Sequence, residues 1–452
     1  MILQVMLILQ KKHVINQNMK THTIPAIISS IGRLFCRRDH IVDDHLIKVG
    51  TGFSGNSINT AIFRKNSIAS HNGIQYISYY DKHGHVILGK RQLGKTEWTL
   101  KKQPFKSKIK DAHNIISIEV DGDGYIHMAY GMHARKLNYA VSCAPGSLHM
   151  ISQSSMDGKE EYSITYPEFY RLPTGDLIFV YRSGKSGNGN IVMKRYVTKD
   201  KRWHTISESI IDGNGARNAY WQMCVDKSGK IHISWVWRET SDVSTNHDLC
   251  YACSDDYGLS WYKSDGTPYS LPITMETAET IVRIPQNSSL MNQGGIDVNS
   301  AGHPYICTYW QKSPTSPLQY HVVWFNGTEW NITDMGNKKT SFALKGTGTK
   351  KASISRPCII CNDNKVYVLF RDEDRGSVVS LACTDNIGRG EWEFIDLTQF
   401  SVDAWEPTID TDLWKENKTL NIFVQNVFQL DGNDRKVPFR KSTPVYILEL
   451  IP

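Results

Sequence analysis

A turn followed by a strand of alternating apolar residues recurs seven times along the chain. The copies begin 50 to 73 residues apart, and they are HNGIQYISYY (71–80), DGDGYIHMAY (121–130), PTGDLIFVY (173–181), DKSGKIHISW (226–235), NSAGHPYICTYW (299–310), NDNKVYVLF (362–370) and ENKTLNIFVQ (416–425). Each unit has room for about four short strands, and helical periodicity is almost absent after residue 50. The sequence therefore predicts an all-β fold, a seven-bladed β-propeller.

A second recurring signal is a turn that precedes a tryptophan, as at Trp98, Trp203, Trp330 and Trp392. The clearest instance is SDDYGLSW (254–261), which fits the Asp-box pattern S-x-D-x-G-x-[ST]-W. Asp and Gly suit a tight turn between strands, and the Trp can pack between neighbouring sheets. This pattern supports the same fold.

The propeller is predicted to occupy residues 46–452 as a single domain, because no linker or change of composition divides that stretch into two β-sandwiches. The final STPVYILELIP is expected to supply a closing strand. Residues 1–45 are set apart as an N-terminal extension or leader. Their run MILQVMLILQKK lacks a basic start and makes a poor signal peptide, and no later run is apolar enough to span a membrane.

The charge balance favours anionic partners. The chain has 52 Lys and Arg against 45 Asp and Glu, a formal net charge of +7, which fits an acidic polysaccharide or oligosaccharide. Nucleic acid is not expected as a partner, because the sequence has no long basic run and no nucleic-acid-binding motif. The 12 Trp and 21 Tyr suit both β structure and stacking on sugar rings.

The nine cysteines are odd in number and widely spread, so a dense disulfide framework is not expected. Two CxxC pairs, Cys250 with Cys253 and Cys358 with Cys361, lie in strand-like apolar runs. Positions i and i+3 of a strand point to opposite faces, which favours buried thiols over a shared zinc site.

Polar residues at the ends of the predicted inner strands are the candidates for a functional site. Taken singly, each has a structural explanation, since a strand His is usually hydrogen-bonded and a strand-end Arg is usually an ion-pair partner. As a set they are notable, because loops from several blades converge at one end of a propeller. The candidates are His113, His133, Tyr166, Arg182, Arg238, His247 and Arg356.

This set of side chains suits β-elimination at a uronate. Arg can bind the carboxylate and stabilise the negative charge that develops as the C5 proton leaves. The reaction also needs a base for that proton and an acid for the departing O4. His and Tyr can fill either role, and the sequence does not decide which does which. No metal is needed in such a site.

Hydrolysis makes a different demand, normally two carboxylates that flank the bond. Glu168 and Glu239 are the nearest candidates, but they form no compelling pair in the sequence. A sialidase would show several Asp boxes and an early RIP motif, whereas RIP occurs here only at 283–285. A propeller that binds acidic glycans without cleaving them is the third alternative.

Segments from about residue 50 to the end resemble the BNR-repeat propellers that include ulvan lyases, L-rhamnosyl-α-1,4-D-glucuronate lyases and α-L-rhamnosidases. The matching motifs are FRKNSIASHNGIQYISYYD, DAHNIISIEVDGDGYIHMAY, TYPEFYRLPTGDLIFVYRSGKSGNGN, TNHDLCYACSDDYGLSW, IPQNSSLMNQGGIDV, GTGTKKASISRP and AWEPTIDTDLWKE. The resemblance implies a seven-bladed propeller whose catalytic group matches His113, His133, Tyr166 and Arg182. It implies substrate-binding roles for Arg238 and Arg356, and His247 is placed with them.

Two positions depart from the family pattern. Lys65 stands in the stretch where a catalytic His has been proposed in the rhamnosidases, which weighs against hydrolysis. Gly131 and Met132 replace an acidic residue and a His before His133, so a lower activity or a shifted substrate is an open alternative.

The sequence thus predicts a polysaccharide lyase acting on a rhamnose- and glucuronate-containing acidic glycan, with L-rhamnosyl-α-1,4-D-glucuronate lyase as the favoured activity. An α-L-rhamnosidase, an ulvan lyase and a non-catalytic glycan binder are the alternatives. No cofactor is required, although a structural calcium ion is compatible with the sequence. A monomer that is secreted or periplasmic is expected, the location resting on the resemblance alone.

Overall fold

The computed structural model describes residues 45–336, 338–340, 342–432 and 441–450. The chain divides into two units, Leu46–Ile451 and a remainder made of residues 1–45 and Pro452. Apart from His45, the predicted N-terminal extension lies outside the described residues. The description below concerns the unit that begins at Leu46.

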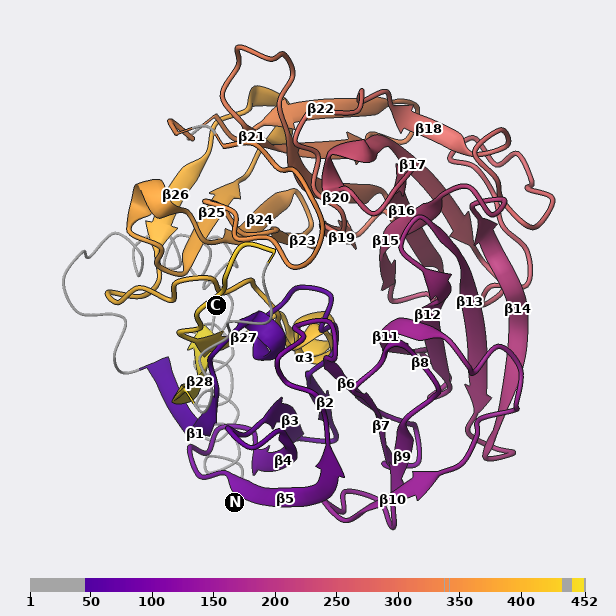
Figure 1. Ribbon diagram of the computed structural model, residues 1–452, viewed down its shortest axis with the longest axis vertical. Coiled ribbons are helices and arrows are strands. Elements are labelled where there is room, and N and C mark those ends of the chain that lie inside the picture. The colour runs from indigo at the N-terminus through magenta and orange to yellow at the C-terminus, as the bar shows by residue number, and fades with distance from the viewer. Residues whose placement is uncertain (1–44, 337, 341, 433–440, 451–452) are drawn as a thin grey trace, which may run out of the picture. The chain divides into compact units, whose positions relative to one another are not determined.

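Seven antiparallel sheets follow one another around a common axis, each built mainly from consecutive strands (Figure 1). The first sheet holds β2 (Ile68–His71), β3 (Ile74–Tyr80), β4 (His85–Gln92) and β5 (Thr99–Lys106). The second holds β6 (Ile116–Val120), β7 (Ile126–Tyr130), β9 (Tyr139–Ser142) and β10 (Met150–Gln153). The third holds β8 (His133–Arg135), β11 (Ile164–Arg171), β12 (Leu177–Lys185), β13 (Asn188–Val197) and β14 (Arg202–Asp212).

The next three sheets each hold four strands. They are β15 (Asn218–Val225), β16 (Ile231–Arg238), β17 (Asn246–Ser254) and β18 (Glu279–Val282); β19 (Gly295–Val298), β20 (Pro304–Trp310), β21 (Gln319–Phe325) and β22 (Trp330–Asp334); and β23 (Cys358–Asn362), β24 (Lys365–Phe370), β25 (Ser380–Thr384) and β26 (Glu393–Asp396). The seventh holds β27 (Leu420–Gln425), β28 (Ser442–Leu450) and β1 (Leu46–Phe53).

The predicted seven-bladed β-propeller is confirmed. Each of the seven repeats recognised in the sequence forms a strand of a different sheet, and these strands are β3, β7, β12, β16, β20, β24 and β27. The repeat is visible in the sequence because a strand with neighbours on both sides keeps its alternating apolar pattern.

The ring closes in the seventh sheet, where strands from both ends of the propeller pair. The predicted closing strand is β28, which lies between β27 and β1, with Ile47 opposite Ile447 and Val424 opposite Tyr446. The sequence analysis did not anticipate that β1, from the start of the propeller, supplies the outer strand. Pairing the first and last strands of the propeller in one sheet closes the ring non-covalently.

The Asp box forms the predicted turn after β17. Asp256 Oδ1 accepts hydrogen bonds from the Ser260 backbone N–H at 2.8 Å and the Ser254 hydroxyl at 2.9 Å. Trp261 is fully buried, and its Nε1–H donates to the Gly258 carbonyl at 3.0 Å. The motif therefore stabilises one blade and contributes nothing to the site described below.

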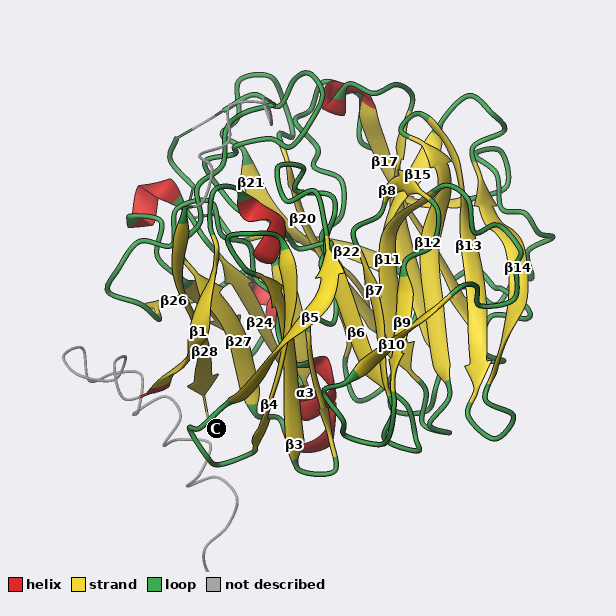
Figure 2. Cartoon of the chain, turned by 60° about the horizontal axis from the view of Figure 1, so that its bottom comes forward, coloured by secondary structure: helices red, strands yellow, loops and turns green. Residues whose placement is uncertain are grey.

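The short helices are α3 (Thr411–Asn417) and the 3₁₀ turns η2 (Ser57–Asn59), η3 (Val243–Thr245), η4 (Glu373–Arg375) and η5 (Ile387–Arg389). The Asp410 side chain caps α3 by accepting from the Leu413 backbone N–H at 3.0 Å. In Figure 2, α3 and β8 lie toward opposite ends of the blades. No helix within the described ranges is long and apolar enough to cross a membrane.

The CxxC thiols are buried, apart from the half-buried Cys358, and burial raises the pKa of all four above the usual thiol value. Within the described residues, the grouping of side chains that could hold a metal ion includes none of them. The structure thus places Cys250, Cys253 and Cys361 in the core of the blades and Cys358 at the wall of a cavity, with no shared metal site among the described residues.

Candidate active site

Six of the seven predicted site residues line one cavity of about 190 Å³. Tyr166 lies near the start of β11, whereas Arg182 and Arg238 lie near the ends of β12 and β16. Because neighbouring strands are antiparallel, these positions meet at the same end of the blades. The six residues are His113, His133, Tyr166, Arg182, Arg238 and Arg356, and Phe63, Tyr220, Asn292 and Lys350 contribute to the same lining.

A bulge in β11 presents Tyr166 to the cavity. The pairing with β12 shifts register between Thr165 and Glu168, and Tyr166 adopts a left-handed backbone conformation with φ 57°. Such strain in a non-glycine residue is costly, and it is characteristic of functional sites. Within the described part of the chain, the Tyr166 hydroxyl makes no hydrogen bond, although the residue is only 3% exposed. This phenol is therefore free to bond to a ligand.

His113 and His133 are held as a pair by one carboxylate. Asp111 Oδ1 lies 3.0 Å from His113 Nδ1, and Asp111 Oδ2 lies 2.7 Å from His133 Nδ1. The two imidazole rings stack with centroids 4.3 Å apart and planes 18° from parallel. The sequence analysis missed Asp111, although it stands only two residues before His113.

The unusual path of β8 brings His133 to this pair. This strand follows β7 in the chain but pairs with β11 of the next sheet, where His133 lies opposite Thr165. The structure explains why Gly131 and Met132 depart from the family pattern. Gly131 has φ 68° and starts the crossover, and Met132 is fully buried in the core between the blades.

The electrostatics of the trio favour an ionised Asp111 carboxylate and a neutral His113 imidazole. Although burial alone would raise it, hydrogen bonds from His113 and His133 hold the pKa of Asp111 far below its usual range. Burial lowers the pKa of His113, and this outweighs the opposing effect of Asp111. Since a carboxylate only accepts, we assign the Nδ1–H donors to face Asp111, which leaves each Nε2 with a lone pair.

The same trio could hold a metal ion. Asp111, His113 and His133 each offer a ligand atom, and these atoms lie within 4.8 Å of one another. The prediction that the site works without a metal stays a prediction, as does the compatibility with structural calcium.

Two arginines converge on a tyrosine that the sequence analysis missed. The Tyr220 hydroxyl lies 3.0 Å from Arg238 Nη1, 3.5 Å from Arg182 Nη1 and 2.9 Å from the Ser186 hydroxyl. Burial acts to raise the pKa of Tyr220, but Arg238 and Arg182 lower it to about 7. An available signal was its place near the start of an inner strand, as for Tyr166.

The two arginines differ in how firmly they are held. Arg238 also donates from Nε to Asn246 Oδ1 at 2.7 Å and from Nη2 to Asn292 Oδ1 at 2.8 Å. Arg182 is 1% exposed, and its Nε has no partner among the described residues. Its guanidinium carbon lies 5.2 Å from the centre of the Tyr166 ring. Arg182 thus retains donors for a ligand.

Arg356 reaches the cavity but is already neutralised. Its Nε and Nη2 donate to the two carboxylate oxygens of Glu406 at 2.8 and 2.6 Å, and both residues are buried. The guanidinium also covers the Phe63 ring at 4.8 Å. We therefore expect Arg356 to shape the cavity and to donate hydrogen bonds, with little net charge to offer an anion.

His247 is not brought to this cavity. Its Nε2 lies 2.8 Å from Glu239 Oε1, and its Nδ1 lies 3.3 Å from Asp248 Oδ2. Burial alone would lower its pKa, but hydrogen bonds to Asp248 and Glu239 raise it. Both ring nitrogens are therefore engaged in an ion-pair network, and the predicted substrate contact of His247 stays untested.

The two hydrolase candidates also lie apart from the cavity lining. Glu239 bonds to Arg217 at 2.8 Å as well as to His247. Glu168 is fully buried and accepts from the Trp221 indole N–H at 3.2 Å and from the Tyr170 hydroxyl. The structure does not bring them together as a pair of carboxylates on either side of a bond.

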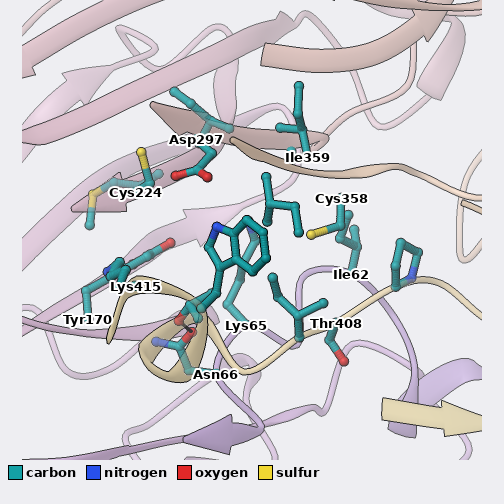
Figure 3. A pocket seen from close by; sticks show the side chains of 18 residues that line it. Ile62, Lys65, Asn66, Tyr170, Cys224, Asp297, Cys358, Ile359, Thr408 and Lys415 are labelled. Carbon is teal, nitrogen blue, oxygen red and sulfur yellow. Dashed lines mark hydrogen bonds between the residues drawn. The ribbon is translucent and has the colours of Figure 1, made fainter. Parts of the chain in front are cut away.

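Lys65 lines a different, largely apolar cavity of about 70 Å³. Figure 3 shows its side chain there with those of Asp297, Cys224, Cys358 and Lys415. Three residues of α3, Thr411, Trp414 and Lys415, also belong to that lining, so this second cavity lies at the α3 end of the blades. The Lys65 side chain therefore does not line the cavity that contains His113, Tyr166 and Arg182, which is called the His–Tyr–Arg cavity below.

Comparison with known proteins assigns this chain to a family. A family model described as BNR repeat-containing matches residues 74–338. An ulvan lyase of Nonlabens ulvanivorans is 23% identical over 336 residues, which cover 63% of this chain and 68% of that protein. An ulvan lyase of Alteromonas sp. (strain LOR) is 21% identical over 330 residues, 62% of this chain and 66% of its own length.

Solved structures show the same fold. A polysaccharide lyase described as a PL25 ulvan lyase superposes with a TM-score of 0.62 at 16% identity, covering 84% of this chain and 92% of the other. The polysaccharide lyase Uly1 gives a TM-score of 0.63 at 15% identity, covering 93% and 95%. At these identities the likeness establishes the architecture, and the chemistry must be argued from the site.

Proposed function

The chain belongs to the BNR repeat-containing family, as the resemblance predicted, and we propose that it is a polysaccharide lyase that cleaves by β-elimination at a uronate. The observation that carries the proposal is one cavity in which Arg182, the His113–His133 pair and the free Tyr166 hydroxyl converge. Relatives named ulvan lyases support the reaction class.

In this proposal, Arg182 and Arg238 bind the uronate carboxylate. Both guanidinium groups face Tyr220 at the cavity wall, and Arg182 keeps unused donors. Neutralising the carboxylate makes the C5 proton more acidic, and positive charge beside it stabilises the enolate-like transition state. Electrostatic stabilisation of this kind is usually the largest single contribution to the rate of an enzyme.

The base is His113 or His133, through Nε2. Asp111 fixes both rings through Nδ1 and would stabilise the imidazolium that forms when either ring takes the C5 proton. Because burial lowers the pKa of His113, that ring is neutral and able to accept a proton near neutral pH.

Tyr166 is the proton donor to the leaving oxygen. Burial raises the pKa of Tyr166 well above that of a free phenol, so the hydroxyl keeps its proton. As the C4–O4 bond breaks, the C5–H electron pair forms the C4–C5 double bond, and the Tyr166 proton passes to O4. The imidazolium loses its proton and the phenolate regains one through solvent, which restores the starting state.

For the substrate, we propose a glycan in which L-rhamnose is α-1,4-linked to D-glucuronate. Arg182 and Arg238 carry two positive charges, which Tyr220, with its pKa of about 7, offsets only in part near neutral pH, so the cavity wall keeps positive charge for a carboxylate. The motif resemblance points to the rhamnosyl-glucuronate branch, whereas the named relatives favour ulvan as the alternative. Export from the cell follows from the same resemblance.

The direct test is the ultraviolet absorbance of the new C4–C5 double bond. Purified protein is incubated with gum arabic and, in parallel, with ulvan, and free rhamnose is assayed in both. Rising absorbance supports a lyase, and the responding polymer identifies the branch. Rhamnose without absorbance would establish a hydrolase, and binding without either product would establish a glycan-binding propeller.

A further inference from the structure

We infer that Asp111, His113 and His133 form a binding site for a divalent transition metal, with Zn²⁺ as the best match, and that the bound ion blocks the elimination reaction. The binding half of this inference stands on the geometry of the three side chains alone. The inhibitory half rests on the function proposed above, in which an imidazole accepts the C5 proton.

The ligand set and its access fit zinc. Imidazole nitrogen and carboxylate oxygen are zinc ligands at about 2.0–2.2 Å, and three protein ligands with one open position form a common site. Here the three ligand atoms lie within 4.8 Å of one another, so small side-chain rotations would bring them around one ion. The His133 and Asp111 side chains are 36% and 31% exposed, and both imidazoles line the cavity, which offers an entry path and room for a water ligand.

Two contacts of buried histidines with carboxylates, those of His127 and His321, are of a different kind. His127 is bonded through Nε2 to Asp121 and through Nδ1 to Tyr139, and His321 through Nδ1 to Asp334 and through Nε2 to the Trp310 carbonyl. In these rings both nitrogens are used by the fold. In His113 and His133 only Nδ1 has a protein partner among the described residues, and both Nδ1 atoms face one carboxylate.

Occupation of the site would change the tautomer of both histidines. Coordination uses the Nδ1 lone pair, so the proton now assigned to Nδ1 must leave and a solvent proton must occupy Nε2. Each Nε2 then becomes an N–H donor. Neither ring can accept the C5 proton in that state, and kcat should fall in proportion to the fraction of protein that holds zinc.

Equilibrium dialysis of the full chain against ZnCl₂, followed by elemental analysis, tests the binding half. A Cys143→Ser background removes the one exposed thiol among the described residues. We expect one zinc per chain, and at least a tenfold weaker affinity in Asp111→Asn and His133→Gln. His149→Gln is the matched control, because that imidazole contacts Lys101 outside the site, and it should bind zinc like the parent.

Circular dichroism shows whether each variant folds, and a well-folded Asp111→Asn or His133→Gln that binds zinc like the parent would overturn the inference. So would a parent protein that binds none. Absorbance assays with stoichiometric zinc, and then with chelator, test the inhibitory half, and a rate that rises with zinc would refute it. If the parent cleaves no polymer, the proposed function fails while dialysis still decides the metal site.

Discussion

The two cavities described above lie at different ends of the blades and show how unlike two hollows of one propeller can be. In the His–Tyr–Arg cavity, charged and polar groups face one another across solvent-accessible space. In the Lys65 cavity, most of the lining is apolar, and burial raises the pKa of the Cys224 and Cys358 thiols (Figure 3). Reactive thiols need a lowered pKa, so these two are poor nucleophiles.

One strand contributes to both cavities. Along β11, Tyr166 lines the first and Tyr170 lines the second, with Glu168 buried between them. The bulge belongs to the first cavity only, since pairing with β12 is regular from Glu168 onward. The β11 bulge, and not the presence of a hollow, therefore distinguishes the part of this strand that lines the cavity proposed to be catalytic.

The largest effect on rate is expected for a cation of the first cavity, and a cation of the second cavity serves as its control. Arg182→Ala should reduce kcat/KM by about 10²- to 10³-fold, because it removes charge stabilisation of the transition state. Lys415→Ala, which removes a cation from the other cavity, should leave the rate unchanged. Steady-state absorbance assays on the responsive polymer measure both, and equal rates for folded Arg182→Ala and the parent would exclude the proposed role.

A somewhat smaller loss is expected for the proton donor. Tyr166→Phe removes only the hydroxyl, so kcat should fall by about 10²-fold while the bulge and ring packing persist. Tyr162→Phe is the matched control, because that tyrosine is 74% exposed and does not line the cavity. An unchanged kcat in Tyr166→Phe would move the donor role to a histidine.

The sequence predicted the fold more completely than the site. Strands with alternating apolar residues reveal the blades in the sequence, because every blade buries the same kind of face, as in β3 and β16. Six of the predicted site residues line one cavity, because positions at or near strand ends of several blades meet there, and their roles stay predictions. Asp111 was missed because a turn carboxylate has no periodic signature, and Tyr220 because its role depends on two arginines from two different sheets.

His247 shows the opposite difficulty. Its position after the Arg238 strand suggested a ligand contact, but the fold places Glu239 and Asp248 on its two nitrogens. Arg356 likewise carries a partner, Glu406, that lies 50 residues further along the chain. Long-range pairing of this kind decides whether a charged side chain is available, and no local pattern reports it.

A pH-dependent effect is expected at Tyr220, whose pKa of about 7 makes it increasingly anionic above neutral pH. The phenolate competes with a substrate carboxylate for Arg182 and Arg238. In the parent, KM should therefore rise several-fold between pH 6 and pH 8, whereas in Tyr220→Phe it should stay flat. Parallel KM profiles in the two proteins would contradict this competition.

The smallest effect on rate is expected for Glu168, which lies between the two cavities. Its substitution should instead change how the free energy of unfolding depends on pH. Burial raises the pKa of Glu168 to about 7, despite the opposing charge of Lys65, and its Oε1 has no partner in the described structure. Protonated Glu168 therefore adds to the free energy of unfolding. This contribution is complete below the unfolded-state pKa of about 4.5 and is lost as the pH rises through 7, and the loss amounts to about 3 kcal/mol.

Glu168→Gln keeps an acceptor for Trp221 and cannot ionise, so its free energy of unfolding should lack this decline between pH 5 and pH 8. Denaturant melts at the two pH values measure the difference, and the absorbance assay should give a rate within about twofold of the parent, because no step of the elimination uses this carboxyl. A rate lost in a folded Glu168→Gln would instead place the chemistry deeper in the propeller and revive the hydrolase alternative.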